Sequence, residues 1–223
     1  MKNVCIKKRG LKRGFTLIEL MVSMVIFVIF MAIVASSFVE IVRAQKETNE
    51  VRKMYAEVRS FVDLVSEEAR LGTVDYDCYA TVAQSFMNAC PKQLKPITSD
   101  GRTTDLALVR KDGMQKTIFR FDSVNQTVKV VKYDALAGGG WAPAAGYTDF
   151  SDIMGNQVKV TRMSFVINPD MNPYSGDKTI YSNGAKQFQP QVTIFMSVSN
   201  RANVRTPLGI DYQTTISSRV YNR

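Results

Sequence analysis

The sequence predicts an α+β protein in which one long N-terminal helix packs on an antiparallel β-sheet. An unbroken helical pattern over the first third of the chain and β-type alternation over most of the rest point to this fold class. A third observation is a run of twenty residues without a charge, from Leu20 to Val39. This run predicts that the first half of the helix spans a membrane, over residues 15–39.

The first 14 residues form a basic leader with six lysines and arginines and no acid. The residues beyond the apolar run are balanced in charge, because Glu40 and Glu47 offset Arg43 and Lys46. Positive charge stays on the cytoplasmic side of a membrane, so we expect a cytoplasmic leader and a C-terminal domain on the other side. Twenty helical residues, at about 1.5 Å each, match a bilayer core of about 30 Å.

One carboxylate, Glu19, lies at the start of the apolar segment. A charge inside a membrane helix costs about 2.5–3.5 kcal/mol on insertion scales, and such residues are functional candidates that need a partner. The alternative is that Glu19 lies near the membrane surface and reaches water.

The run Arg13-Gly14-Phe15-Thr16-Leu17-Ile18-Glu19 joins the basic leader to the apolar segment. It resembles the class III signal of type IV prepilins and type II secretion pseudopilins, over the N-terminal part of the chain only. The resemblance implies cleavage by a prepilin peptidase after Gly14 and N-methylation of Phe15. It also implies that Glu19 pairs with the Phe15 α-amine of a neighbouring subunit and so sets the register of a filament.

Two other forms of processing remain open. A general signal peptidase could cut after Ala35 and leave Ser36 as the first residue, but the apolar run before that site exceeds the usual length of about 7–15 residues. The chain could also remain an uncleaved membrane anchor.

Residues 40–72 continue the helix as an amphipathic segment, with apolar residues three and four positions apart. These residues are Val51, Met54, Tyr55, Val58, Phe61, Val62, Val65 and Ala69. We expect them to pack only, in a helix that runs from Phe15 to Leu71 and ends at Gly72.

Residues 73–104 are expected to form an irregular loop with two cysteines, Cys78 and Cys90. Loss of the leader removes Cys5, so these two remain, on the side of the membrane where disulfides persist. A disulfide between them is worth about 3 kcal/mol on the chain-entropy model. Two unpaired buried thiols are the alternative. A metal site is not expected, because two thiols in a chain without histidine do not complete a zinc shell.

The remainder of residues 73–223 forms the globular β-rich domain. Its expected strands are residues 105–111, 114–121, 127–133, 157–167, 191–199 and 210–220. Alternation in Met163, Phe165 and Ile167 predicts a sheet with one face against a helix. A helix followed by such a meander is also the pilin-like layout that the resemblance implies.

No catalytic arrangement is evident, and we expect neither an enzyme nor a cofactor. The chain has no histidine for a catalytic triad, and the glycine run 138–140 precedes Trp141 where a phosphate loop would carry a lysine. Oxygen-bearing residues within 168–189 could line a calcium site, but their spacing differs from the known pattern and a solvated loop is preferred. These residues are Asp170, Asn172, Ser175 and Asp177.

The predicted function is that of a minor structural subunit of a type IV pilus or a type II secretion pseudopilus, most like the J or W types. Its expected partners are the prepilin peptidase, other pilin or pseudopilin subunits, the inner-membrane assembly platform and membrane lipid. The alternative is a competence pilin that binds DNA through cations of the predicted hairpins, although a solvated strand face explains them more simply. The cations are Arg110, Lys111, Lys116, Arg120, Lys129 and Lys132.

Overall fold

The computed structural model describes residues 14–79, 90–156, 158–170, 172–173, 189–201 and 208–218. The chain divides into two compact units, Met1–Asn49 and Glu50–Arg223. Helix α1 (Leu17–Leu71) contributes to both units, so each part of the helix is described with its own unit. The helix predicted from Phe15 to Leu71 is therefore confirmed, with a start two residues later.

The first unit consists of the N-terminal part of α1. Its apolar side chains are exposed along the described length, from Phe15 at 88 % to Ile41 at 55 %. Among the described residues, α1 is the one helix long and apolar enough to cross a membrane. A continuous exposed apolar surface of this length calls for lipid or other subunits around it.

In the second unit, one stripe of α1 forms part of the core. Met54, Val58, Phe61 and Val65 are each at most 2 % exposed, and they follow the three-and-four spacing of a helix face. Tyr55, which the sequence pattern assigned to this stripe, is 52 % exposed. It follows Met54 directly and so lies about 100° further around the helix.

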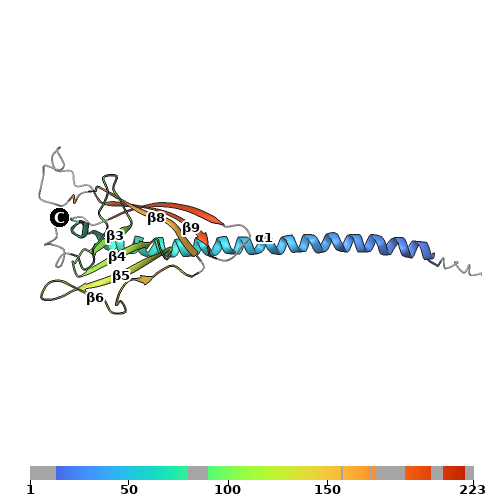
Figure 1. The fold of residues 1–223 in the computed structure, drawn as a ribbon, viewed down its shortest axis with the longest axis horizontal. Coiled ribbons are helices and arrows are strands. Elements are labelled where there is room, and N and C mark those ends of the chain that lie inside the picture. The colour runs from blue at the N-terminus through green and yellow to red at the C-terminus, as the bar shows by residue number, and fades with distance from the viewer. Residues whose placement is uncertain are drawn as a thin grey trace, which may run out of the picture. The chain divides into compact units, whose positions relative to one another are not determined.

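Two antiparallel sheets complete the second unit, where the sequence predicted one (Figure 1). Sheet A has the order β1-β3-β4-β5-β6, with β7 also paired to β5. Its strands are β1 (Gly72–Val74), β3 (Asp105–Arg110), β4 (Gln115–Asp122), β5 (Thr127–Ala135), β6 (Trp141–Pro143) and β7 (Ser151–Asp152). Sheet B has the order β10-β9-β8-β2. Its strands are β2 (Arg102–Thr103), β8 (Val158–Asn168), β9 (Gln191–Asn200) and β10 (Gly209–Ser217).

All six predicted strands are present, as β3, β4, β5, β8, β9 and β10. The predicted end of the last strand, residues 219–220, lies outside the described residues. The buried side chains of both sheets and of α1 form one apolar cluster. The fold class predicted from the sequence, a long helix packed on antiparallel β-structure, is therefore confirmed.

A β-bulge in β8 keeps its apolar side chains on one face. Val158 and Val160 are buried, and so are Met163, Phe165 and Ile167, although the two sets differ in parity. The pairing with β9 passes from Val160–Val198 to Arg162–Ser197. Thr161 is the extra residue. It shifts the in-and-out alternation of the side chains by one position, so that the apolar residues before and after the bulge all face the core.

The expectation of an irregular loop over residues 73–104 is wrong in part. β1 pairs with β3, a 3-10 turn (Tyr76–Tyr79) follows it, and β2 begins sheet B. These elements are too short to show a periodic pattern. Gly72 is needed at the junction because a Cβ there would lie 2.2 Å from the Val109 carbonyl oxygen. β1 and β3 can approach each other this closely at position 72 only through glycine.

Deletion of Thr161 should prevent folding of the second unit. Loss of the bulge moves one of the two apolar sets of β8 to the solvent face. We expect loss of the cooperative unfolding transition and rapid proteolysis of the detergent-purified protein, whereas Thr161→Ser should behave as the wild type. A deletion variant that unfolds cooperatively at the wild-type midpoint would contradict this role of the bulge.

Candidate processing and assembly site

The expected cleavage point lies in an exposed segment ahead of α1. Gly14, Phe15 and Thr16 precede the helix, and Phe15 is 88 % exposed. A Cβ on Gly14 would meet no atom of this chain within 4 Å. The fold therefore does not require glycine at position 14, and a requirement for it would have to come from a processing enzyme.

Thr16 and Glu19 form a capping box at the start of α1. The Thr16 backbone N–H donates to Glu19 Oε2 at 2.9 Å, and the Thr16 hydroxyl donates to the same oxygen at 3.0 Å. In return the Glu19 N–H donates to Thr16 Oγ1 at 3.4 Å. Reciprocal bonds of this kind satisfy backbone donors that the first turn of a helix leaves unpaired.

The capping contacts use only one carboxylate oxygen. Among the described hydrogen bonds, Glu19 Oε1 takes part in none. That oxygen can accept from a donor outside the chain while Oε2 keeps the helix start in place. Phe15 and Glu19 are four residues apart, about 6 Å along a helix axis, so a neighbour displaced by about one turn could bring its amine to this oxygen.

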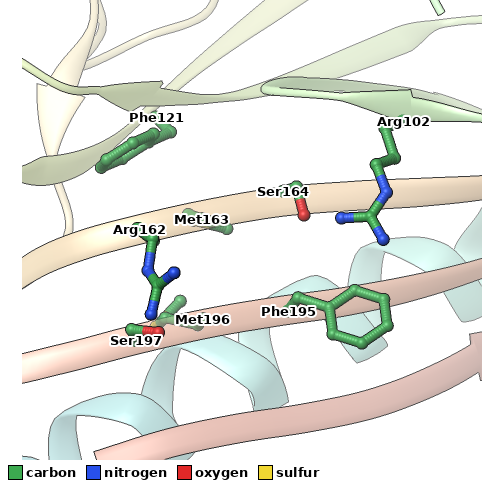
Figure 2. Close-up of a pocket in the computed structure, with 8 residues that line it drawn as sticks. All are labelled: Arg102, Phe121, Arg162, Met163, Ser164, Phe195, Met196 and Ser197. Carbon is green, nitrogen blue, oxygen red and sulfur yellow. The ribbon is translucent and has the colours of Figure 1, made fainter. Parts of the chain in front are cut away.

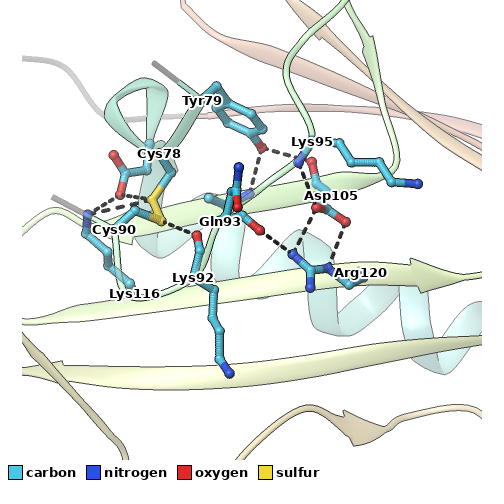
Figure 3. The surroundings of a disulfide bond; sticks show 11 residues. Cys78, Tyr79, Cys90, Lys92, Gln93, Lys95, Asp105, Lys116 and Arg120 are labelled. Atoms are coloured by element: carbon cyan, nitrogen blue, oxygen red, sulfur yellow. Dashed lines mark hydrogen bonds and ion pairs between the residues drawn. A yellow bond between two sulfur atoms is a disulfide. The ribbon is translucent and has the colours of Figure 1, made fainter. Parts of the chain in front are cut away.

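In the second unit the two cysteines form the expected disulfide, Cys78–Cys90, with Cα atoms 5.0 Å apart (Figure 3). Cys78 is fully buried, and Cys90 is 5 % exposed. Asp75 and Lys116 form an ion pair beside the disulfide. The Lys116 ammonium also lies 4.5 Å from the centre of the Trp141 ring. Burial raises the pKa of the Asp75 carboxyl, although the neighbouring Lys116 acts in the opposite direction.

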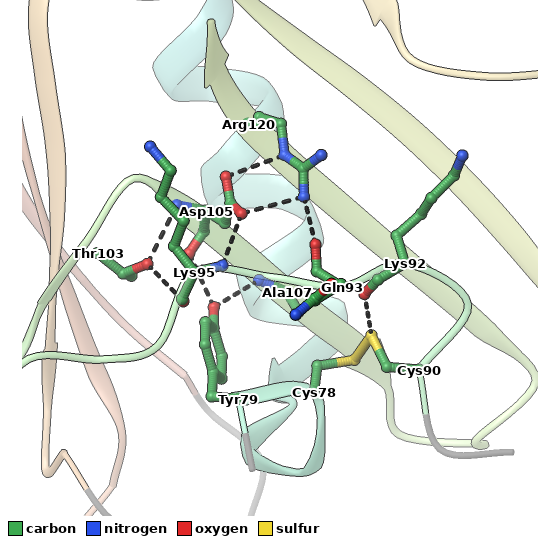
Figure 4. Close-up of polar contacts among 10 residues, drawn as sticks. All are labelled: Cys78, Tyr79, Cys90, Lys92, Gln93, Lys95, Thr103, Asp105, Ala107 and Arg120. Carbon is green, nitrogen blue, oxygen red and sulfur yellow. Dashed lines mark hydrogen bonds and ion pairs between the residues drawn. A yellow bond between two sulfur atoms is a disulfide. The ribbon is translucent and has the colours of Figure 1, made fainter. Parts of the chain in front are cut away.

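A second polar cluster holds the segment that follows the disulfide (Figure 4). Arg120 binds the Asp105 carboxylate through Nε and Nη2, both at 3.1 Å, and donates from Nη2 to the Gln93 carbonyl at 2.7 Å. Asp105 is 1 % exposed and also accepts from the Lys95 N–H at 3.0 Å. Tyr79 donates to the Asp105 carbonyl, and burial raises the pKa of its phenol. The cluster ties the loop to β3 and β4.

Most cations considered for DNA binding are paired with carboxylates. The pairs are Arg110 and Lys132 with Glu68, Lys116 with Asp75, Arg120 with Asp105, and Lys129 with Asp122. Lys111 is the remaining member of the set. The sequence does not reveal these partners because most of them lie on different elements. The interpretation of these residues as a solvated strand face is wrong where the side chains are buried, as for Lys116.

A shallow pocket of about 370 Å³ lies on sheet B (Figure 2). Its lining comprises Arg102, Phe121, Arg162, Met163, Ser164, Phe195, Met196 and Ser197. These side chains offer guanidinium groups, rings and hydroxyls, but no carboxylate or thiol that could act as a general base or nucleophile.

Of the residues considered for calcium, Ser175 and Asp177 lie outside the described residues. Within the part of the chain that is described, no group of three or more His, Cys, Asp or Glu residues could hold a metal ion. The glycine run 138–140 forms a turn, with φ of +86° at Gly139 and +89° at Gly140. The Thr16–Glu19 box was overlooked, although Thr-x-x-Glu before an apolar run is its sequence signature.

Comparison with known families matches residues 9–35 to the prokaryotic N-terminal methylation motif. Comparison with curated proteins and with solved structures found no match. The matched range contains the Gly14–Phe15 bond, the capping box and most of the apolar run. Residues 9–35 thus carry the N-terminal methylation motif, and the long helix packed on antiparallel sheets is a pilin-like architecture.

Replacing Arg120 by methionine should destabilise the second unit strongly. The variant keeps the aliphatic stem but leaves the buried Asp105 carboxylate without its cation, which costs about 3–5 kcal/mol. The matched control is Arg59→Met, whose ion pair with Asp63 has side chains 84 % and 71 % exposed. An exposed pair is worth less than about 1 kcal/mol. Urea unfolding of the detergent-purified variants measures both losses, and equal losses would contradict the assignment.

Proposed function

We propose that this chain is a minor subunit of a type IV pilus or a type II secretion pseudopilus. It is stored in the inner membrane with its N-terminus in the cytoplasm and its C-terminal domain on the opposite side. It is then cleaved and packed into a filament through α1. The observation that carries the proposal is the methylation motif at residues 9–35, which overlaps the start of an exposed apolar helix.

Processing uses the exposed segment ahead of α1. A prepilin peptidase cuts after Gly14, and Phe15 becomes the N-terminal residue and is methylated on its new amine. The leader removed by this cut carries six of the nine net positive charges of the chain, so the mature side chains keep +3. These cations serve topology: they hold the leader in the cytoplasm until the cut.

Assembly uses the amine that cleavage creates. An α-amine has a pKa of about 8 and is a cation at neutral pH. In the apolar surroundings of packed helices, it is paired with Glu19 of a neighbouring subunit, through the carboxylate oxygen that capping leaves available. The assembly platform and the other subunits bring the helices together, and this ion pair fixes their axial register.

Two long connections support a minor role over that of a major, repeated subunit. Residues 136–157, which include β6 and β7, connect β5 of sheet A to β8 of sheet B, and residues 169–190 connect the paired strands β8 and β9. Hairpin loops are usually about 2–5 residues long, and much longer connections are often functional. A subunit that occupies one special position in the filament can carry such long connections more readily than a major subunit, every copy of which must pack against identical neighbours.

DNA uptake is not proposed as a second function. The cations that suggested it are engaged in ion pairs, apart from Lys111, and a cation already neutralised by a carboxylate gains little from a phosphate.

Replacing Gly14 by valine should leave the leader attached. Position 14 has no steric restriction within the chain, so the variant should insert and fold as the wild type does. Intact mass and N-terminal sequencing of membrane-extracted protein distinguish the two forms. A mature wild-type chain that begins at Ser36 would exclude the proposed processing.

Removing the charge of Glu19 should block assembly while leaving cleavage and insertion intact. Glu19→Gln separates the two roles of this residue, because glutamine also completes a capping box but cannot neutralise an ammonium. If the charge is required, Glu19→Gln and Glu19→Ala should both fail to enter filaments, since an unpaired ammonium in apolar surroundings is costly.

The measurement is the amount of subunit in sheared filaments relative to the amount in the membrane, by quantitative mass spectrometry. Wild-type incorporation of Glu19→Gln would show that capping alone matters. The same preparation gives the molar share of the wild-type chain, and a share equal to that of the most abundant pilin would contradict a minor role.

A further inference from the structure

Lys116 and Asp75 bring an amine and a carboxyl together inside the second unit. Lys116 lies on β4, and Asp75 directly follows β1, two strands away in sheet A. Lys116 Nζ contacts Asp75 Oδ2, and the two side chains are 6 % and 5 % exposed. Figure 3 shows Lys116 beside the disulfide. The buried Cys78 Sγ lies 3.9 Å from Nζ and 3.3 Å from Asp75 Oδ2.

The surroundings of this pair exclude water. The ring of Trp141 covers the Lys116 ammonium at 4.5 Å, and the disulfide closes another side. Solvation is the main factor that keeps an ammonium and a carboxylate charged, so its loss favours transfer of the proton from lysine to aspartate. The pKa of the Asp75 carboxyl is raised by burial, in the direction that such a transfer requires.

A second ion pair, between Lys132 of β5 and Glu68 of α1, differs from this one in its surroundings. Lys132 contacts Glu68, but the Lys132 side chain is 20 % exposed. Glu68 also lies 3.9 Å from Arg110 Nε and accepts from the Thr117 hydroxyl. Glu68 thus has a second cation and a hydroxyl donor nearby, and its partner Lys132 is partly open to water. In the described ion pairs of Asp75, by contrast, Lys116 is the one cation.

We propose that Lys116 and Asp75 condense to form an intramolecular amide bond between Nζ and Cγ. The ammonium first gives a proton to the carboxylate, which produces a neutral amine and a neutral acid. The nitrogen lone pair then attacks Cγ, and a hydroxyl leaves as water with a proton from the nitrogen. One C–N bond forms, one C–O bond breaks, one water is released, and no oxidant or cofactor is needed.

Intramolecular contact supplies the driving force. Amide formation between separate molecules is opposed by bulk water, but groups held in reactive geometry show effective molarities of about 10⁵ M or more. The resulting bond would tie the segment after α1 to β4 across β3, next to the disulfide.

The test is peptide mapping and intact mass of the mature full-length protein, extracted in detergent and reduced. If the bond forms, the chain is lighter than its sequence by one water, and trypsin does not cut after Lys116. A branched peptide should then join residues 71–92 to residues 112–120. The N-terminal peptide of the same digest reports the processing separately, so that failure of the proposed function does not affect this result.

Three variants complete the experiment. Lys116→Arg and Asp75→Ala should each show the full mass of their own sequence, and Lys132→Arg should keep the loss of one water. A wild-type chain of full mass, with Lys116 cut by trypsin or labelled by an amine reagent after unfolding, would overturn the proposal. That outcome would leave an ordinary buried ion pair.

Discussion

The fold of the second unit depends on one apolar stripe of α1. Met54, Val58, Phe61, Val65 and Ala69 are buried in the same cluster as the inward side chains of both sheets. Phe61 meets Phe119 of β4 edge to face, with ring centres 6.1 Å apart. The same helix continues into the first unit, where its apolar side chains are exposed. One element therefore serves two environments, and its composition changes where the environment does.

The sequence predicted the elements that show a periodic pattern of apolar residues. The helix and six strands were found because each is long enough to repeat its pattern several times. The change of parity between Val160 and Met163 also lay in the sequence, and a bulge is its physical meaning. The division into two sheets could not be predicted, since it depends on which strands pair and not on whether they are strands. β1, β2, β6 and β7 have two or three residues each, too few to show any period.

Some residues of the candidate sites could likewise be predicted from a local sequence pattern, whereas others could not. Gly14, Phe15 and Glu19 could be recognised because they join a basic leader to an apolar run, and Cys78 and Cys90 because they are the two cysteines outside the leader. The partners of the buried charges could not be found, because Asp75 meets Lys116 and Asp105 meets Arg120 only after sheet A has formed. The carboxylates of Asp75, Asp105 and Glu68 are each at most 5 % exposed, and each has a cation. Buried pairs add little net stability, but a wrong register would strand a charge, so they favour one arrangement of the strands.

These contacts also bear on the proposed function, in which the subunit is moved through its helix. A force along α1 reaches the second unit through its buried apolar stripe and, at the last turn, through Glu68, which pairs with Lys132 of β5 and lies close to Arg110 of β3. Directly after Gly72, β1 is hydrogen-bonded to β3, and the disulfide lies in the segment that follows. Force is thus shared among several strands before it can separate any one of them. In the proposed function, extraction from the membrane acts on the apolar half of α1, whereas the half from Glu50 onward is held by its buried apolar stripe and by the contacts of Glu68. A single unbroken helix can link the two, because its first half is apolar on all sides and its second half is apolar on one face.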